Sequence, residues 1–162
     1  MKVSEIMRRI VHTIGADATL DVASKHMANE NISLLPVVEK APVAGSHLPE
    51  DVVKNLGFMP VTEEEVLVGV ITTRDIVVRA IASDKDPEKT HVSEIMTKDL
   101  ACCLENDDIA DALAMMERRK VRRLFTLDSQ NRVVGIVSRH DLWRARNETS
   151  GRDVTKHDSG SQ

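Results

Sequence analysis

Apolar residues recur at helical spacing, with polar residues between them, in two separate stretches of the chain. Both stretches follow the i, i+3, i+4, i+7 rule of a helix with one inward face, so each predicts an amphipathic helix. The positions on the predicted inner faces are Leu20, Ala23, Ser24 and Met27 in the first stretch, and Ile109, Ala112, Leu113 and Met116 in the second. Asp17 or Thr19 offers an N-cap to the first helix, and Asp107 or Asp108 offers one to the second.

Short apolar runs of strand length surround each of these helices. One run precedes the helix, two follow it, and the last run leads directly into a second helix. The predicted strands are residues 11–14, 34–38 and 66–71 in the first half and 100–104, 123–127 and 133–137 in the second, with closing helices at 73–81 and 139–145. Both halves therefore read β-α-β-β-α, which is an α/β (α+β) class. Because so small a sheet cannot bury both of its faces alone, we expect the halves to pack together.

The two halves are copies of one unit. The pentapeptide Val-Ser-Glu-Ile-Met stands at 3–7 and returns unchanged at 92–96. The first copy is longer because it carries an inserted loop at 40–66, in which residues 49–56 offer a short helix with proline in its first turn. The predicted organisation is a first copy at 1–82, a linker at 83–91, a second copy at 92–146 and a polar tail at 147–162 that is expected to be disordered.

Composition narrows the class of protein. Of the 162 residues, 41% are hydrophobic and 30% are charged, and with one Trp, two Phe and no Tyr the core must be aliphatic. A net charge of −4 and the scarcity of aromatic side chains argue against nucleic acid as the main partner. No apolar run reaches the ~20 residues that span a bilayer, and the N-terminus lacks the features of a secretory signal. We therefore expect no membrane partner and a cytoplasmic location.

The sequence carries no recognisable arrangement for catalysis or metal binding. The histidines show no HxxxH or HxH spacing, and the adjacent Cys102 and Cys103 have no second cysteine pair. GxSxG, HExxH and P-loop motifs are absent from the sequence. We expect no enzyme, no catalytic residue, no metal site and no required cofactor. The two thiols are expected to be reduced, with one pointing inward and one outward on a strand.

The duplicated motifs resemble those of tandem cystathionine-β-synthase (CBS) domains, including stand-alone bacterial pairs of the hypoxic-response type. The motifs are the two VSEIM openings, the helix segments ASKHM and ALAMM, the segment ISLLPVV and the closings GVITTRDI and GIVSRHDL. The resemblance implies two units packed as a pseudo-two-fold pair, often dimerised further. It also implies clefts between the units that bind AMP, ADP, ATP, NAD(H) or S-adenosylmethionine as regulatory ligands.

Each copy places a hydroxyl and a carboxylate where its last strand meets its last helix: Thr72 with Asp75, and Ser138 with Asp141. A helix N-terminus favours phosphate, and a carboxylate can accept hydrogen bonds from both ribose hydroxyls. In CBS domains the matching aspartate holds the ribose, so the resemblance implies this role for Asp75 and Asp141. The alternative is a capping box, in which hydroxyl and carboxylate satisfy the first turn of the helix. The two roles can coexist.

Two arginines of the second copy are candidate phosphate ligands. Arg122 and Arg123 stand where the first copy has uncharged side chains. In a related nucleotide-sensing kinase subunit, basic residues at these positions reach the phosphates of a ligand held by the other repeat's aspartate. The resemblance thus implies that Arg122 and Arg123 complete the Asp75 cleft, whereas the Asp141 cleft prefers less charged ligands or stays empty. The alternative is that residues 117–123 are only a solvated basic run.

Other positions complete the expected ligand site. The ligand-binding residues that the resemblance implies are Thr13, Leu35, Pro36, Thr72, Arg74, Asp75, Arg122, Arg123, Ser138, His140 and Asp141. Phe125 stands where Pro36 stands in the first copy, and it would change the wall against which adenine stacks. The charge of His140 changes near neutral pH, so that its effect on a nearby phosphate would depend on pH.

The expected function is that of a sensor without chemistry of its own. Binding of an adenosine-containing ligand would signal through a conformational or oligomeric change, in a homodimer, to a separate effector protein that the sequence does not identify. The alternative is an interaction or dimerisation scaffold with vestigial clefts. It rests on the missing output domain, the Phe125 departure and the long inserted loop.

Overall fold

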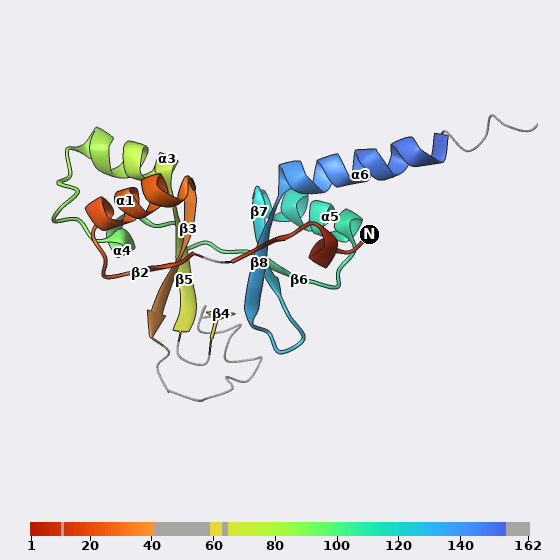
Figure 1. The fold of residues 1–162 in the computed structure, drawn as a ribbon, viewed down its shortest axis with the longest axis horizontal. Helices are drawn as coiled ribbons and strands as arrows, with labels where there is room; N and C mark the ends of the chain where they lie inside the picture. The colour runs from red at the N-terminus through yellow and green to blue at the C-terminus, as the bar shows by residue number, and fades with distance from the viewer. Residues whose placement is uncertain (11, 41–58, 63–64, 155–162) are drawn as a thin grey trace, which may run out of the picture. The chain divides into compact units, whose positions relative to one another are not determined.

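The structure is a computed structural model that describes residues 1–10, 12–40, 59–62 and 65–154. The chain divides into two compact units (Figure 1). Unit 1 comprises Met1–Arg9, Ala101–Ser129 and the chain from Val134 onward, and unit 2 comprises Ile10–Leu100 and Gln130–Val133. The expected short helix at 49–56 lies outside the described residues.

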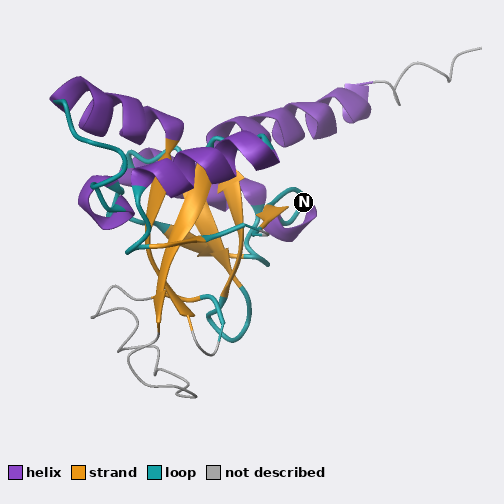
Figure 2. Ribbon diagram, turned by 60° about the vertical axis from the view of Figure 1, so that its left-hand side comes forward, coloured by secondary structure: helices purple, strands orange, loops and turns teal. Residues whose placement is uncertain are grey.

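Each unit is a four-stranded mixed sheet with helices, as Figure 2 shows in orange and purple. In unit 2 the strand order is β2-β3-β5-β4, and in unit 1 it is β1-β8-β7-β6. The elements of unit 2 are β2 (Ile14–Gly15), α1 (Leu20–Glu30), β3 (Leu34–Lys40), β4 (Met59–Pro60), β5 (Glu65–Thr72), α3 (Thr73–Asp75), the π-helical turn η2 (Ile76–Ala80), the 3-10 turn η3 (Ile81–Ser83) and α4 (Val92–Ile95). The elements of unit 1 are η1 (Val3–Glu5), β1 (Arg8–Arg9), β6 (Cys102–Leu104), α5 (Ile109–Arg119), β7 (Arg123–Leu127), β8 (Val133–Ser138) and α6 (Arg139–Val154).

The two amphipathic helices form as the periodicity predicts. The Thr19 hydroxyl accepts a hydrogen bond from the Val22 N–H at 3.4 Å and caps α1. The Asp108 carboxylate accepts one from the Ala110 N–H at 3.0 Å and caps α5. The apolar positions listed above are buried in both helices, but Ser24 is exposed and does not belong to the inner face. Each helix ends on a residue in the left-handed conformation, Asn31 or Lys120.

The opening segment of each copy packs into the unit formed mainly by the other copy. In α4 the side chains of Val92 and Ile95 are 0% and 1% exposed, and both belong to the core of unit 2 with Leu20 and Leu35. In η1 the side chain of Val3 is 0% exposed and belongs to the core of unit 1. The copies at 1–82 and 92–146 are therefore repeats of sequence, whereas the compact units have exchanged their opening segments.

A methionine and a glycine mark the place of this exchange in each unit. A Cβ atom added to Gly69 would lie 2.5 Å from the Met96 Sδ, and one added to Gly135 would lie 2.9 Å from the Met7 Sδ. Met7 also accepts a hydrogen bond from the Thr126 hydroxyl at 3.0 Å. The last residue of each VSEIM segment thus packs against the glycine of the other copy's closing motif, where an added Cβ atom would crowd the methionine sulfur and a backbone carbonyl, that of Thr97 or Arg8.

The ends of the copies differ from expectation. The closing helix of the first copy begins at Thr73, as predicted, and continues through α3, η2 and η3 to Ser83. The closing helix of the second copy, α6, was expected to end at 145 and instead continues to Val154, so residues 147–154 are helical where a disordered tail was expected. The linker at 83–91 is tied to α1, because the Asp21 N–H donates to the Pro87 carbonyl and the Leu20 N–H to the Thr90 carbonyl, both at 3.0 Å.

We predict that the exchanged contacts couple in pairs. Gly135→Ala should destabilise the protein by about 1–3 kcal/mol because the added methyl overpacks against the Thr126 hydroxyl, the Arg8 carbonyl and the Met7 sulfur. Shortening Met7 to Ala in that background should recover part of the loss, which a double-mutant cycle of urea unfolding measures as a coupling energy.

The control cycle combines Gly135→Ala with Met96→Ala, whose sulfur lies in the other unit. That pair should be additive. Equal coupling of Gly135 to Met7 and to Met96 would contradict the exchanged packing.

Candidate functional site

The two hydroxyl–carboxylate pairs are capping boxes at the junction of strand and helix. The Thr72 N–H donates to Oδ2 of Asp75 at 3.0 Å, and the Asp75 N–H donates to the Thr72 hydroxyl at 3.1 Å. In unit 1 the Ser138 N–H and hydroxyl donate to Oδ2 of Asp141 at 3.4 and 2.6 Å, and the Asp141 N–H donates to the Ser138 hydroxyl at 3.2 Å. The capping role is therefore present in both copies, and it engages the same carboxylate oxygen in each.

The second oxygen of each carboxylate faces an arginine. Oδ1 of Asp75 lies 3.8 Å from Nε of Arg79, one turn along the same helical segment. Oδ1 of Asp141 lies 3.4 Å from Nη2 of Arg8 on β1. The carboxylate side chains are 12% and 11% exposed, whereas the arginines are 49% and 77% exposed. Each carboxylate thus keeps one oxygen toward a partly exposed charged group rather than into the core.

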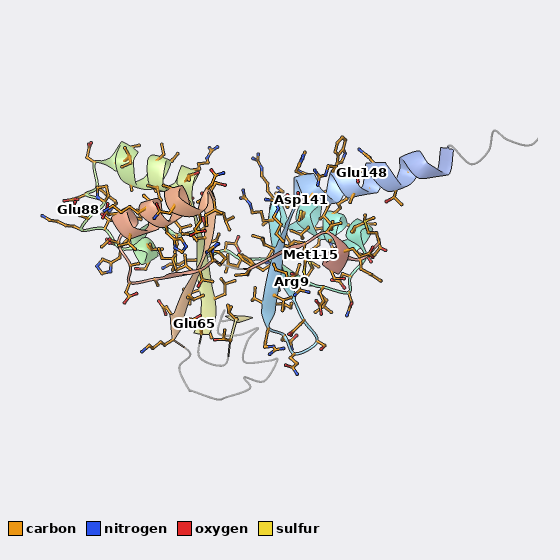
Figure 3. All side chains as sticks on the ribbon, viewed as in Figure 1. Arg9, Glu65, Glu88, Met115, Asp141 and Glu148 are labelled. Atoms are coloured by element: carbon orange, nitrogen blue, oxygen red, sulfur yellow. The ribbon has the colours of Figure 1, made fainter. Side chains whose placement is uncertain are left out.

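The electrostatics of Asp141 follow from this geometry. Burial raises the pKa of Asp141, but the hydrogen bonds from Ser138 and the charge of Arg8 outweigh burial and hold the pKa below its ordinary value. The carboxylate is therefore ionised at neutral pH and able to accept hydrogen bonds. Figure 3 shows Asp141 at the start of α6, with Glu148 farther along the same helix.

A pocket of about 700 Å³ lies within unit 1, next to this capping box. It is formed by residues at the start of β7, at the end of β8, on one face of α6 and on α5. Its lining residues are Leu113, Glu117, Arg122, Arg123, Ser138, Arg139, His140, Trp143 and Arg146. Four of the expected ligand-binding residues therefore share one pocket: Arg122, Arg123, Ser138 and His140.

Positive charge dominates the pocket. Its lining has four arginines and one carboxylate, Glu117. Oε1 of Glu117 lies 3.6 Å from Nη2 of Arg139, and both side chains are more than half exposed. The Arg139 N–H donates to the Arg122 carbonyl at 2.9 Å, which ties the start of α6 to the start of β7. The positive end of the α6 dipole adds to the same field, so the pocket suits an anion.

The basic run is thus divided between two environments. Arg118, Arg119 and Lys120 are exposed at the end of α5 and do not line the pocket. Arg122 and Arg123 are exposed as well, but they stand at the pocket wall. The first three residues are therefore solvated side chains, whereas the last two line the pocket.

The remaining expected residues lie in unit 2, where their side chains differ in availability. Thr72 and Thr13 are half-buried and Arg74 is exposed. Leu35 is 0% exposed, and its side chain belongs to the core of unit 2. Pro36 is also buried. In unit 1, Phe125 is 3% exposed and belongs to the buried apolar side chains.

Three pocket residues were missed at the level of sequence. Arg139, Trp143 and Arg146 stand at i, i+4 and i+7 of α6 and so share one face of that helix. The sequence contains this spacing, but the helix was expected to end at 145, so Arg146 fell outside it.

The described residues show little support for metal or thiol chemistry. Among them no group of three or more histidine, cysteine or acidic side chains is placed to hold a metal ion. Cys102 is half-buried and Cys103 is buried, as strand alternation predicts. Burial raises the pKa of Cys103 to about 12, with smaller contributions from Asp107 and Cys102, so that this thiol is protonated at neutral pH. No described helix has both the length and the apolar character required to cross a bilayer.

The mixed sheets, their helices and the duplicated capping boxes define a protein of the α/β class, and comparison identifies its family. The sequence profile of the CBS domain matches residues 3–45 and 92–145. The chain is 40% identical over 155 residues to the CBS domain-containing protein YhcV of Bacillus subtilis, covering 94% of this chain and 92% of that protein. This chain belongs to the CBS domain family and carries two copies of the domain.

Other relatives carry the same pair inside larger proteins. The chain is 32% identical over 145 residues to the inosine-5′-monophosphate dehydrogenase of Methanocaldococcus jannaschii. The match covers 90% of this chain but only 23% of that enzyme. The similarity is therefore to a part of the enzyme.

Solved structures confirm the α/β fold of a CBS domain pair. Hypoxic Response Protein I with two coordinated zinc ions matches with a TM-score of 0.61 at 26% identity, over 90% of this chain and 98% of that one. The CBS domain pair of protein MJ0100, in complex with 5′-methylthioadenosine and S-adenosyl-L-methionine, matches with a TM-score of 0.63 at 24% identity, over 92% and 98%. CBSX2 in complex with AMP matches with a TM-score of 0.59 at 19% identity, over the same shares of the two chains.

We predict a pH-dependent cost for removing the Ser138 hydroxyl. Ser138→Ala should lower the free energy of unfolding by roughly 1 kcal/mol near neutral pH, because it removes a cap and a hydrogen bond to an ionised carboxylate. A depressed folded-state pKa stabilises the fold above the unfolded value of about 3.9 and loses that stabilisation as the pH falls through the folded value. The difference between wild type and variant, measured by urea unfolding, should therefore shrink as the pH is lowered below about 4.

Ser24→Ala serves as the control, since Ser24 is an exposed helical serine. Its effect on stability should be small and independent of pH. If the loss of unfolding free energy in Ser138→Ala stayed constant at acid pH, the result would contradict the role of Ser138 in lowering the pKa of Asp141.

Proposed function

We propose that this CBS domain pair is a regulatory module that binds an adenosine-containing ligand, one of AMP, ADP, ATP, NAD(H) or S-adenosylmethionine, in clefts between its repeats. Two observations on related folds support the proposal: the MJ0100 pair is in complex with 5′-methylthioadenosine and S-adenosyl-L-methionine, and CBSX2 is in complex with AMP. The module performs no chemistry on its ligand. It acts by binding one conformational or oligomeric state more tightly than the other.

The observation that carries the proposal is the orientation of the two capping carboxylates. Capping engages Oδ2 of Asp75 and of Asp141, and Oδ1 of each faces only a partly exposed arginine side chain among the contacts of the described residues. A pair of ribose hydroxyls can replace the arginine at Oδ1 while the cap stays intact. Capping and ribose binding are thus compatible in one residue, and they use different oxygens.

The phosphate end of the ligand is assigned to Arg122 and Arg123. Their position on the wall of a positively charged pocket with Ser138 and His140 supports a phosphate role. In the proposal, Arg122 and Arg123 bind the phosphates of a ligand whose ribose Asp75 holds, and Arg74 and Thr72 are further ligand-binding residues. His140 lines the same pocket.

A scaffold function is the second candidate, and exposed apolar side chains favour it. Val22 on α1, Val77 and Val78 on η2 and Ile81 on η3 are each more than half exposed in unit 2. Apolar side chains in that number on neighbouring helices suit a protein contact, either in the proposed homodimer or with an effector. A scaffold with vestigial clefts would retain this surface and bind none of the nucleotides.

Isothermal calorimetry against AMP, ADP, ATP, NADH and S-adenosylmethionine tests the proposal. We expect at least one ligand to bind. Asp75→Ala or Asp141→Ala should then weaken it by about tenfold or more, because a hydrogen bond to a charged group contributes about 1.5–3 kcal/mol.

Asp108→Ala is the matched control, since it also removes an aspartate N-cap, on α5, without touching either capping box of the closing helices. Its affinity should equal that of wild type. No heat with any ligand would exclude the sensor and leave the scaffold, and equal losses in all three variants would show that stability, not contact, controls binding.

A further inference from the structure

We infer that the pocket of unit 1 selects ligands with two or more linked phosphate groups, and that Glu117 is the resident carboxylate which such a ligand displaces. The inference rests on the proposed function for the location of phosphate binding, and it goes further by fixing the class of ligand. It assigns binding roles to Arg139, Arg146 and Glu117, and it makes Trp143 the reporter of occupancy.

The charge in the pocket sets the class of ligand. Four guanidinium groups and one carboxylate leave a net charge of three positive units with His140 neutral. A phosphate monoester carries about −1.5 to −2 at neutral pH and leaves the pocket positive. A diphosphate or triphosphate brings the balance close to neutrality, whereas the sulfonium and ammonium groups of S-adenosylmethionine are repelled. The excess of arginine therefore favours a polyphosphate over AMP and over S-adenosylmethionine.

The length of the cationic wall matches a chain of phosphates. Arg139 and Arg146 stand seven positions apart on one face of α6, which is roughly 10 Å along the helix axis. Arg122 and Arg123 face the same pocket from the start of β7. A single phosphate group cannot reach both ends of such a wall, but linked groups can engage arginines from the two elements at once, with bidentate hydrogen bonds at each.

Glu117 occupies the place of an anion in this arrangement. Its Oε1 lies 3.6 Å from Nη2 of Arg139, and the glutamate is 66% exposed, so the contact is open to water and weak. An exposed pair of this kind is easily exchanged for a more highly charged partner. The carboxylate therefore neutralises one arginine while the pocket is empty and opposes any bound phosphate.

Trp143 allows the pocket to be observed directly. It is the only tryptophan of the chain, there is no tyrosine, and its side chain is 53% exposed at the pocket wall. Emission excited at the indole band therefore comes from one residue of the site. A ligand that fills the pocket changes the surroundings of this ring.

The experiment titrates the full chain with inorganic tripolyphosphate, ATP, AMP, adenosine and S-adenosylmethionine, following Trp143 emission and the heat of binding together. Tripolyphosphate and ATP should produce saturable changes in emission, with affinities at least tenfold above that of AMP, and higher salt should weaken them. Arg146→Gln should weaken both by about tenfold. Glu117→Gln should tighten both by a few-fold, since it removes the opposing charge.

Two surface residues of α6 supply matched controls. Arg144 and Glu148 pair with each other at 3.9 Å and do not line the pocket. Arg144→Gln and Glu148→Gln repeat the changes in net charge and should leave both affinities within twofold of wild type. If Arg144→Gln weakens tripolyphosphate as much as Arg146→Gln does, attraction by overall charge explains the binding and the inference is overturned.

The remaining outcomes separate this inference from the proposed function. Equal affinities for AMP and ATP without binding of tripolyphosphate would overturn the polyphosphate site and leave the adenosine sensor intact. Binding of tripolyphosphate and ATP with equal affinity would support the pocket and remove adenosine recognition. Heat of binding with no change in Trp143 emission would place the ligand outside the pocket and overturn the polyphosphate site. The absence of both heat and emission change with every probe would overturn both proposals.

Discussion

In each unit, the packing of a methionine side chain against a glycine is the contact on which the rest of the unit depends. Met7 on Gly135 and Met96 on Gly69 bring the opening segment of one copy onto the closing strand of the other. At the first of these contacts β1 then pairs antiparallel with β8, which carries the capping box of Ser138 at its end. β1 also places Arg8 beside the Asp141 carboxylate. Core packing, sheet completion and the electrostatics of the candidate site in unit 1 are therefore consequences of one exchange.

The capping boxes leave one carboxylate oxygen of each aspartate outside the cap. A carboxylate has two oxygens, and capping in this chain uses the same one in both copies. Hydrogen bonds to the first oxygen restrict the rotamer of each aspartate. In the proposed function the second oxygen would therefore meet the ribose in an orientation that folding has already set. The partner at that oxygen in this structure is an arginine side chain rather than a backbone group.

Much of the fold was accessible from the sequence, because each signal was local. The inner faces of α1 and α5, the caps Thr19 and Asp108 and the strand β7 follow from periodicity and capping rules within a few residues. The exchange was not accessible, since identical VSEIM segments give no indication of which copy receives them. The pocket was predictable only in part. The resemblance supplied Arg122 and Ser138, but the residues on α6 depend on how far that helix extends. Its weak amphipathicity does not predict where it ends. The burial of Leu35 was not accessible either, because its position on a strand does not reveal which side chains pack in the core.

The exchange of opening segments also bears on how such a chain can change over evolutionary time. A single copy excised from this sequence would keep an opening segment whose seat is on the other copy, and would lose the segment that fills its own core. Each half would expose a groove that its own residues do not fill. The indivisible unit of inheritance is therefore the pair: recombination that moves one copy alone yields a protein with two unmatched surfaces, whereas moving both together transfers a finished fold into a new host protein.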